Sequence, residues 1–541
     1  MPVKATNPIL SGFYPDPSIC AVGDDYYIVN SSFAYFPGLP IMHSKDMANW
    51  EQIGNVLTRK SQLPLDDATT SRGLFAPTMR YHDGTFYVIC TNVSFGGNFI
   101  VTSDKAEGPY SDPHYIEGAD GIDPSLFFDD DGRCYYIGTH PNPDGCKYNG
   151  DWYIYIQELD IKEFKLIGEP KNVWNGALKG VHWPEGPHLY HIGEYYYILH
   201  AEGGTGPEHA VSVARSKEVF GPYENNFCNP IFTHRHLGVK YPIKYVGHAD
   251  LVQLSNGAWY MVMLAVRPVG GFTTMGRETF LARVIWENDW PVVNPGLGVL
   301  SAELMVDLDE KKSELPTTSL PGVSKLYDFT NQEKLGPEWL FLRNPKEDMY
   351  EFVKGEGLFL RCEKDDITGT GKPSFLAIRQ DSHCFEAAIT LKGDDLYDGA
   401  SAGLAIYQNE EYQLRFEYSG CSGNVILRRD GKDEKIASLL LAQNIVTLVI
   451  NVIGTKASLF MVEGKELREL VKGLDISALS TEVAGGFVGC TVGIFARDIE
   501  ERPEKVRACF KSFSYKRLVP VRVNKEKPDA AKENGADADN E

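Results

Sequence analysis

One pattern recurs five times in the first 300 residues: a short strand-like run, a turn at Asp or Gly, and a second run rich in aromatic residues. The copies are separated by 47 to 63 residues, and each is followed by another strand pair. A unit of about 60 residues that holds four strands is typical of a β-propeller blade. A β-sandwich with coincidental hairpins is the alternative, and five copies in phase argue against it. The sequence therefore predicts a five-bladed β-propeller over residues 1–300. The copies begin at Asp16, Ala76, Asp123, Glu185 and His248.

The repeat stops after residue 300. Residues 301–322 are charged and then rich in Pro, Ser and Thr, which is typical of a linker. From 323 to 518 the chain returns to alternating strand-like runs without a helical stretch, which predicts a two-sheet β-sandwich and an all-β protein. Residues 519–541 end in the polar run NKEKPDAAKENGADADNE, and we expect a disordered tail there.

Charge and hydropathy narrow the classes of partner. The net charge of −21 repels phosphate backbones, and no basic cluster offsets it, so nucleic acid is not expected as a partner. The chain has no apolar run fit for a signal peptide and no stretch of about 18 apolar residues. We therefore expect a cytoplasmic protein without a membrane partner.

The ten cysteines are scattered, and none forms a CxxC pair. Half of them lie inside apolar strand-like runs, which favours buried free thiols over a disulfide framework. The spacing required for a structural zinc site is missing.

The first residues of the repeat units include the candidate catalytic residues. The innermost strand of every blade starts near the propeller axis, so these five positions are expected to meet in one pocket. Three of them are carboxylic acids (Asp16, Asp123 and Glu185), and each lies next to proline, which fixes the local backbone. Crowded carboxyl groups raise one another's pKa, so a protonated acid and an ionised base can coexist at one pH. Two carboxyl groups flanking a bond are the minimal apparatus of glycoside hydrolysis.

Two other classes of propeller are weighed against this. A single Asp-Pro is more often a turn cap, but three at equivalent repeat positions favour a shared site. A propeller lectin for neutral sugars would have little reason to gather three carboxylates. A protein-interaction propeller is disfavoured because WD and kelch signatures are absent.

Six runs together resemble glycoside hydrolase family 43, and its β-xylosidase branch most closely. They span residues 7–283, and the domain order of that branch, a five-bladed propeller and then a concanavalin-like β-sandwich, matches to about residue 518. The runs are NPILSGFYPDPSI, SRGLFAPTMRYHDGTFYV, IDPSLFFDDDGRCYYIG, EGPHLYHIGEYYYILHAEGGT, GHADLV and MGRETFLARV.

The resemblance implies roles for the three acids. The Asp of FYPDPS, Asp16, matches the family's general base, and the Glu of EGPH, Glu185, matches its general acid. The Asp of IDPS, Asp123, matches the carboxylate that adjusts the pKa and orientation of the acid.

The resemblance also implies the substrate-binding residues. Arg277 of GRET and His248 of GHA are expected against the non-reducing sugar, with Phe33 of SSFAYFPG beside it. Taken alone, Arg277 would fit a surface ion pair, and His248 a core histidine. Phe75 stands where relatives usually carry Trp, which leaves the preference between xylose and arabinose open. Trp183 fits either the pocket border or packing between blades.

The function implied is an exo-acting, inverting β-xylosidase that takes β-1,4-xylo-oligosaccharides. An α-L-arabinofuranosidase acting on arabinose-containing oligosaccharides, or an enzyme with both activities, is the alternative within the class. A non-catalytic sugar-binding propeller is the alternative outside it. The sandwich is expected to dock on the propeller and lend a loop to the pocket rim. A homo-oligomer is left open.

No cofactor or metal site is expected. Some family members hold calcium beside a central histidine, so calcium at His248 is kept as a weaker expectation. The chain has no run of Asp and Asn that resembles a dedicated calcium loop. The DDDG run at 129–132 is expected to be a hairpin turn.

Overall fold

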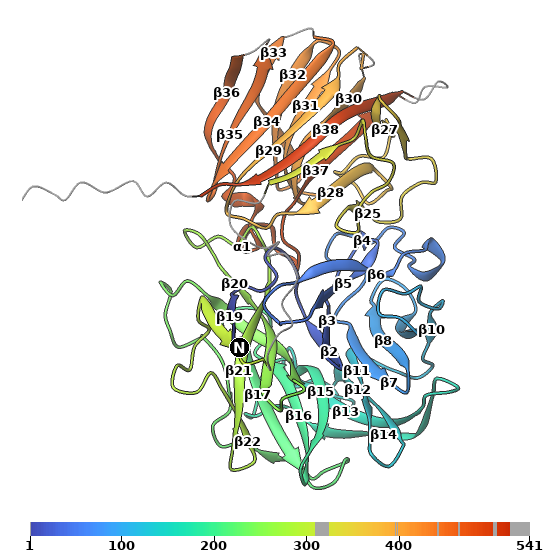
Figure 1. Cartoon of the computed structure of the whole chain (residues 1–541), viewed down its shortest axis with the longest axis vertical. Coiled ribbons are helices and arrows are strands. Elements are labelled where there is room, and N and C mark those ends of the chain that lie inside the picture. The colour runs from blue at the N-terminus through green and yellow to red at the C-terminus, as the bar shows by residue number, and fades with distance from the viewer. Residues whose placement is uncertain are drawn as a thin grey trace, which may run out of the picture.

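The computed structural model describes residues 2–308, 324–394, 396–397, 399–440, 443–463, 466–500 and 506–519. Two bodies are stacked along the long axis of the molecule (Figure 1). The lower one, coloured blue to green, is formed by the first 300 residues, and the upper one, yellow to red, by the residues after 323.

The lower body is the five-bladed propeller that the repeat predicts. Residues 2–308 are all described, and they contain five antiparallel four-stranded sheets in chain order. The blades are β2 (Ser18–Val22), β3 (Asp25–Val29), β5 (Gly38–Ser44) and β6 (Glu51–Leu57); β7 (Thr78–His82), β8 (Thr85–Asn92), β9 (Gly97–Ser103) and β10 (His114–Tyr115); β11 (Ile122–Phe128), β12 (Cys134–Pro141), β13 (Trp152–Asp160) and β14 (Lys165–Trp174); β15 (Glu185–Ile192), β16 (Tyr195–Glu202), β17 (Ala210–Ser216) and β18 (Glu224–Asn225); and β19 (Lys244–Gln253), β20 (Trp259–Val266), β21 (Glu278–Glu287) and β22 (Trp290–Val293).

The first strands of the blades form the inner ring. Strand β2 contacts β7 and β19, β11 contacts β7 and β15, and β15 contacts β19. The turn at residues 129–132 connects β11 to β12, so DDDG is the hairpin turn that was expected.

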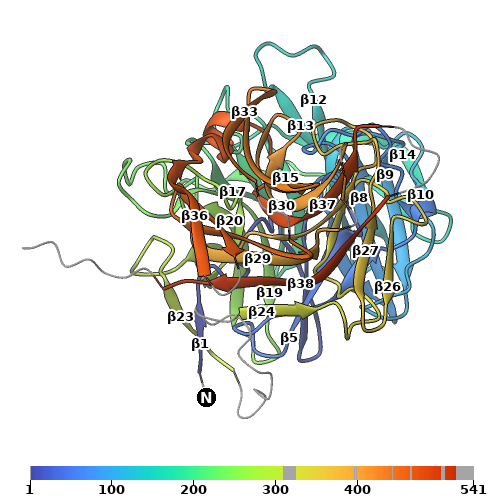
Figure 2. The same ribbon diagram turned by 90° about the horizontal axis from the view of Figure 1, so that it is seen from above.

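The N-terminal segment closes the ring against the fifth blade. Strand β1 (Val3–Thr6) pairs with β23 (Glu303–Val306), and the two strands run together beside the N-terminus (Figure 2). The side chain of Asn7 both donates to and accepts from the backbone of Leu281, at 2.9 Å in each case. Strand β23 falls inside the segment expected to be a linker, so ordered structure continues to residue 308; residues 309–323 lie outside the described part of the chain.

The upper body is a β-sandwich. Its described residues form two facing sheets of eight strands each, one of which includes a strand of the propeller. The first sheet holds β24 (Ser324–Asp328), β26 (Tyr350–Val353), β27 (Gly357–Arg361), β29 (Cys384–Lys392), β34 (Ile445–Ile453), β35 (Lys456–Glu463), β36 (Glu466–Asp475) and β38 (Arg507–Arg517); the second holds β4 (Tyr35–Phe36), β25 (Leu340–Leu342), β28 (Ser374–Arg379), β30 (Ala400–Asn409), β31 (Tyr412–Ser419), β32 (Ser422–Arg429), β33 (Lys432–Leu440) and β37 (Thr491–Asp498). The tail from residue 520 on lies outside the described residues.

The two domains share hydrogen bonds and apolar core. Strand β4 leaves the first blade and pairs with β25, with Phe36 opposite Phe341. Phe13 and Phe33 of the propeller are buried in one cluster with Phe375 and other sandwich residues. Burial of apolar surface stabilises the folded protein by about 25 cal/mol per Å², so exposing either face of this interface to water would be unfavourable.

Helices are few and short. The described residues contain η1 (Lys60–Gln62), η2 (Ser477–Leu479) and α1 (Thr481–Ala484). None of these could cross a membrane. None of the ten cysteines, all of which are described, forms a disulfide, and seven of them are buried, so the expectation of buried thiols outside a disulfide framework is confirmed for those seven.

Candidate active site

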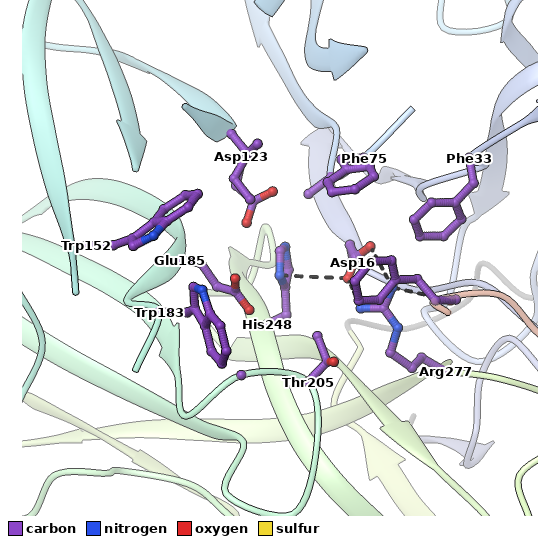
Figure 3. Close-up of a pocket in the computed structure, with 14 residues that line it drawn as sticks. Asp16, Phe33, Phe75, Asp123, Trp152, Trp183, Glu185, Thr205, His248 and Arg277 are labelled. Atoms are coloured by element: carbon purple, nitrogen blue, oxygen red, sulfur yellow. Dashed lines mark hydrogen bonds and ion pairs between the residues drawn. The ribbon is translucent and has the colours of Figure 1, made fainter. Parts of the chain in front are cut away.

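A cavity of about 270 Å³ lies where the five inner strands begin. The first residues of all five repeat units line it, as the propeller prediction required. All seven residues singled out in the sequence line it too, and Figure 3 shows their side chains converging. Its lining is Asp16, Phe33, Phe75, Ala76, Ile122, Asp123, Trp152, Trp183, Glu185, Gly204, Thr205, His248, Arg277 and Phe487.

The backbone at these positions departs from a regular strand. Asp16, Asp123 and His248 adopt left-handed conformations, with φ of 52°, 52° and 47°. The pairing register shifts between Ile122 and Ser125, on either side of Asp123, and again between Glu185 and His188, as in a β-bulge. A non-glycine residue with positive φ costs of order 1–3 kcal/mol where the conformation is sparsely populated, and such residues cluster at functional sites. The bulges therefore aim the carboxyl groups into the cavity instead of across the sheet.

Asp16 is held as an ionised carboxylate. Nη1 of Arg277 donates to its Oδ1 at 2.7 Å, and the hydroxyl of Ser31 donates to its Oδ2 at 2.6 Å. Burial raises the pKa of Asp16, but Arg277, His248 and Ser31 together outweigh it, so the pKa lies below the usual value of 3.8. This carboxylate is suited to accept a proton.

Glu185 has the opposite electrostatics. Burial raises its pKa well above 4.5, and the charges of Asp123 and Asp16 raise it further. Asp123 is 7% exposed, and its own pKa is raised to about 6, first by burial and then by Asp16. The backbone N–H of Gly186 donates to Oδ2 of Asp123 at 3.1 Å, which ties Asp123 to the residue that follows Glu185. Glu185 is therefore the carboxyl suited to donate a proton.

His248 stands between Asp16 and Glu185 (Figure 3). Its Nδ1 lies 3.8 Å from Oδ1 of Asp16. On its other side it packs against Gly186, where an added Cβ would come within 2.8 Å of the imidazole. The glycine of EGPH is therefore needed for this approach. His248 is buried, but it faces the cavity, so it is not a histidine of the apolar core.

Arg277 is a buried residue, only 8% exposed, so its alternative assignment to a surface ion pair is wrong. Its guanidinium carbon lies 5.9 Å from the ring centroid of Phe33 and 5.6 Å from that of Phe487. Phe75 meets both rings edge-on, at 5.7 and 5.8 Å. Three phenylalanines thus form an aromatic wall beside Asp16, and this is a surface on which a sugar face can stack.

Phe487 was not found from the sequence. It belongs to the sandwich, and its place at the cavity confirms that this domain lends a loop to the pocket rim. Its backbone N–H donates to the hydroxyl of Ser71 at 2.9 Å, and it lies in an irregular segment between α1 and β37. No periodic signal marks such a residue.

Trp152 and Trp183 line the opposite end of the cavity, beside Glu185 (Figure 3). The sequence is compatible with Trp183 either at the pocket border or packed between blades, and in the structure it lines the pocket. An added Cβ on Gly204 would lie 2.9 Å from its ring, so this glycine gives the indole its place. Trp152, the first residue of β13, was missed because it occupies no first position of a repeat unit.

A second ring of polar residues lies further along the inner strands. Arg80 donates to Oδ2 of Asp250 at 3.0 Å and contacts Nδ1 of His188 at 2.9 Å. Ser18 also donates to Asp250, at 2.8 Å. The guanidinium of Arg80 is therefore paired with the buried carboxylate of Asp250. Calcium takes six to eight oxygen ligands, and the carboxylate beside His248 is paired with Arg277. The carboxylates of Asp16 and Asp250 thus each have an arginine partner.

Comparison with known proteins agrees with this geometry. Residues 5–291 match the model of glycosyl hydrolases family 43, and residues 327–516 match that of the β-xylosidase C-terminal concanavalin A-like domain. A xylosidase/arabinosidase of Butyrivibrio fibrisolvens is 48% identical, over 91% of this chain and 96% of its own.

Two further proteins are similar over nearly the whole length. A non-reducing end α-L-arabinofuranosidase of Bacteroides ovatus is 37% identical, over 91% of this chain and 90% of its own. The crystal structure of a xylan β-1,4-xylosidase from Bacillus halodurans superposes with a TM-score of 0.86 at 34% identity, covering 95% of this chain and 100% of that one.

Proposed function

The chain belongs to glycosyl hydrolases family 43, and we propose that it releases xylose from the non-reducing end of β-1,4-xylo-oligosaccharides with inversion at the anomeric carbon. The observation that carries the proposal is the opposite shift of two pKa values in one cavity. The pKa of Asp16 is lowered and that of Glu185 is raised, as an ionised base and a protonated acid require.

The reaction follows from these two protonation states. A water molecule held by Asp16 gives up a proton to the carboxylate as its oxygen attacks the anomeric carbon. Glu185 protonates the glycosidic oxygen as the bond to the leaving sugar breaks. Arg277 favours the ionised form of Asp16. Burial and the charge of Asp123 favour the protonated form of Glu185, so its proton is available for transfer to the glycosidic oxygen.

The shape of the cavity supports exo action. Phe33, Phe75 and Phe487 line the cavity in contact with one another beside Asp16, and we expect this aromatic wall to stop a xylan chain beyond the reacting sugar. The leaving group then lies toward Glu185, between Trp152 and Trp183. An enzyme with this arrangement removes one sugar at a time.

Arabinofuranosidase activity on the same site is the second candidate. Arabinofuranose and xylopyranose can present similar hydroxyl arrangements, and the wall that receives them carries Phe75, a smaller ring than Trp. Two relatives carry arabinosidase or arabinofuranosidase in their names. A non-catalytic sugar-binding role is not favoured, because such a site gains nothing from an acid kept protonated beside an ionised base.

A panel of nitrophenyl glycosides tests the proposal. We expect chromophore release from the β-xylopyranoside, with release from the α-arabinofuranoside measuring the second activity. Asp16→Ala is the control for a contaminating hydrolase and should release none. Absence of release from every pyranoside and furanoside would contradict the proposal.

We propose further that the enzyme needs no metal ion and acts in the cytoplasm. Arg80 supplies a positive charge to the carboxylate of Asp250, which therefore needs no metal cation as a partner. The free cysteines are in keeping with a reducing compartment. Cell fractionation with an activity assay tests the location, and activity found outside the cytoplasm would contradict it.

A further inference from the structure

The three backbone carbonyls that precede Asp16 are each held by a different side chain. The carbonyl of Tyr14 accepts a hydrogen bond from the hydroxyl of Thr279 at 2.6 Å. The carbonyl of Pro15 accepts one from Nδ2 of Asn30 at 3.0 Å. Both donors belong to the propeller.

The donor to the first carbonyl comes from the other domain. Nε of Arg379, the last residue of β28 in the sandwich, donates to the carbonyl of Phe13 at 2.9 Å. Its guanidinium carbon lies 4.8 Å from the ring centroid of Phe13 and 4.5 Å from that of Tyr14. Arg379 is 4% exposed, so this cation is enclosed between two aromatic rings.

Ser11 and Gly12, which precede Phe13, also contact the sandwich next to Arg379. The hydroxyl of Ser11 donates to the carbonyl of Asp381 at 2.7 Å. An added Cβ on Gly12 would lie 2.6 Å from the carbonyl oxygen of Gln380, so the backbones are in close contact there. Residues 11–13 are thus fixed along residues 379–381 of the sandwich.

We propose that Arg379 is a positioning residue for the general base: it fixes the Phe13–Tyr14 segment and thereby places the carboxylate of Asp16. The inference rests on the proposed function, because it presumes that Asp16 activates the water. Asp16 has a left-handed backbone at φ 52°, which persists only if its flanking peptides are held. A displacement of about 1 Å in a catalytic group can cost about a hundredfold in rate.

The effect works through position and not through the charge of Arg379. The cationic side chain that contacts Asp16 directly is Arg277, at 2.7 Å. Arg379 instead contacts a backbone carbonyl and two ring faces. A lysine keeps the charge but cannot reproduce the planar stack or the Nε–H hydrogen bond, so Arg379→Lys is not expected to rescue the function.

The test compares Arg379→Lys and Arg379→Met with Arg415→Lys in the full-length chain. Arg415 is also a buried arginine of the sandwich, and its ion pairs with Asp366 and Asp433 lie within that domain. Steady-state kinetics are measured on xylobiose and on nitrophenyl β-xyloside, per folded molecule, with the folded fraction taken from gel filtration and near-UV circular dichroism.

We expect both Arg379 variants to lose about 10- to 100-fold in kcat on both substrates alike, with KM changed by less than about threefold. The loss should be equal because water activation is needed whatever the leaving group. Arg415→Lys should keep the wild-type kcat. In a double-mutant cycle, Arg379→Met and Tyr14→Leu should be non-additive, because they remove the same contact.

Wild-type kcat per folded molecule in both Arg379 variants would overturn the inference, whatever their melting temperatures. Full rescue by lysine would overturn it too, since the charge would then suffice. Activity of the wild-type chain decides the proposed function separately: an inactive wild type on the whole glycoside panel refutes both, whereas an active wild type with active variants refutes only the role of Arg379.

Discussion

Arg277 donates to both carboxylate oxygens of Asp16, at 2.7 and 3.4 Å, although 261 residues separate the two in sequence. They meet because the first and fifth blades are neighbours in a closed ring, with β2 against β19. The pair joins a residue expected to bind the sugar to the residue expected to activate water. The ionisation of Asp16 is therefore favoured by a side chain that also lines the cavity.

Replacing Arg277 should change both the rate and its pH dependence. Arg277→Ala should lower kcat/KM by about 3 kcal/mol or more, because a buried sugar hydroxyl loses its partner. Arg277 lowers the pKa of Asp16, so its removal should raise that pKa and move the acidic limb of the kcat/KM profile to higher pH. Arg277→Lys should rescue little, because it lacks the planar fork.

Arg283→Ala is the matched control for this measurement. Arg283 lies in β21, a few residues beyond Arg277, and pairs with Asp307 near the surface. It should leave the pH profile unchanged. An unshifted acidic limb in Arg277→Ala would mean that Arg277 does not hold Asp16 ionised.

Glu185→Gln should stabilise the protein in a pH-dependent way. The pKa of Glu185 in the folded state is raised well above its usual 4.5, so the wild type loses stability as pH rises from 4.5 through the folded-state pKa. Glutamine has no proton to lose and avoids this loss. The melting temperature of the variant should exceed that of the wild type by about 2 °C or more near pH 8 and match it near pH 4.

Glu169→Gln, at an exposed position in β14, is the control for this series. Its melting-temperature difference from the wild type should be the same at both pH values. A Glu185→Gln difference that does not grow with pH would show that Glu185 is not kept protonated by the fold.

A chain that ends near residue 320 should be inactive or insoluble. It would lack Phe487 at the cavity and Arg379 beside the base segment, and it would expose the apolar cluster around Phe13 and Phe33. Strand β4 would also lose its partner β25. A chain that ends at Val519, which keeps every described strand, should be fully active. A soluble and fully active 1–320 fragment would refute a structural role of the sandwich.

Treatment with EDTA should leave most of the activity intact. The carboxylate of Asp250 is already paired with Arg80, and that of Asp16 with Arg277, so neither needs a cation to balance its charge. Activity is compared before chelation, after it, and after calcium is added back. Loss on chelation with recovery on calcium addition would place an ion at His248 after all.

The repeat was sufficient to predict the blades and the convergence of their first residues. In a closed propeller the first strand of every blade lines the centre, so the residues at which these strands begin lie around one cavity. The opposite pKa shifts of Asp16 and Glu185 could not be predicted from the sequence, since they depend on how far each acid is buried and on which charged groups the fold places beside it. Phe487 and Arg379 were not identified from the sequence for a different reason. Both residues belong to the sandwich and contact the propeller across the domain interface. The sequence of the sandwich has no repeat that indicates which of its residues make such contacts.

The unequal roles of Asp16 and Glu185 give the most decisive test of the assignment. His248 stands between the two side chains (Figure 3), and its Nδ1 lies 3.8 Å from Oδ1 of Asp16. Inverting glycosidases hold their two carboxyl groups about 6.5–9.5 Å apart to admit a water, whereas retaining pairs lie about 5 Å apart. We therefore predict α-xylose as the first product from a β-xyloside, observed by NMR before mutarotation.

The same division of labour predicts how two variants differ. Asp16→Ala loses the activation of water, so it should be nearly inactive on every substrate. Glu185→Ala loses only the protonation of the leaving group, so its activity should fall far more on xylobiose than on nitrophenyl β-xyloside, whose phenolate departs unaided. Asp130→Ala, at a carboxylate 93% exposed in the β11–β12 turn, is the control and should match the wild type on both. If both active-site variants keep the same ratio between the two substrates, or if β-xylose appears first, the assignment of base and acid is wrong.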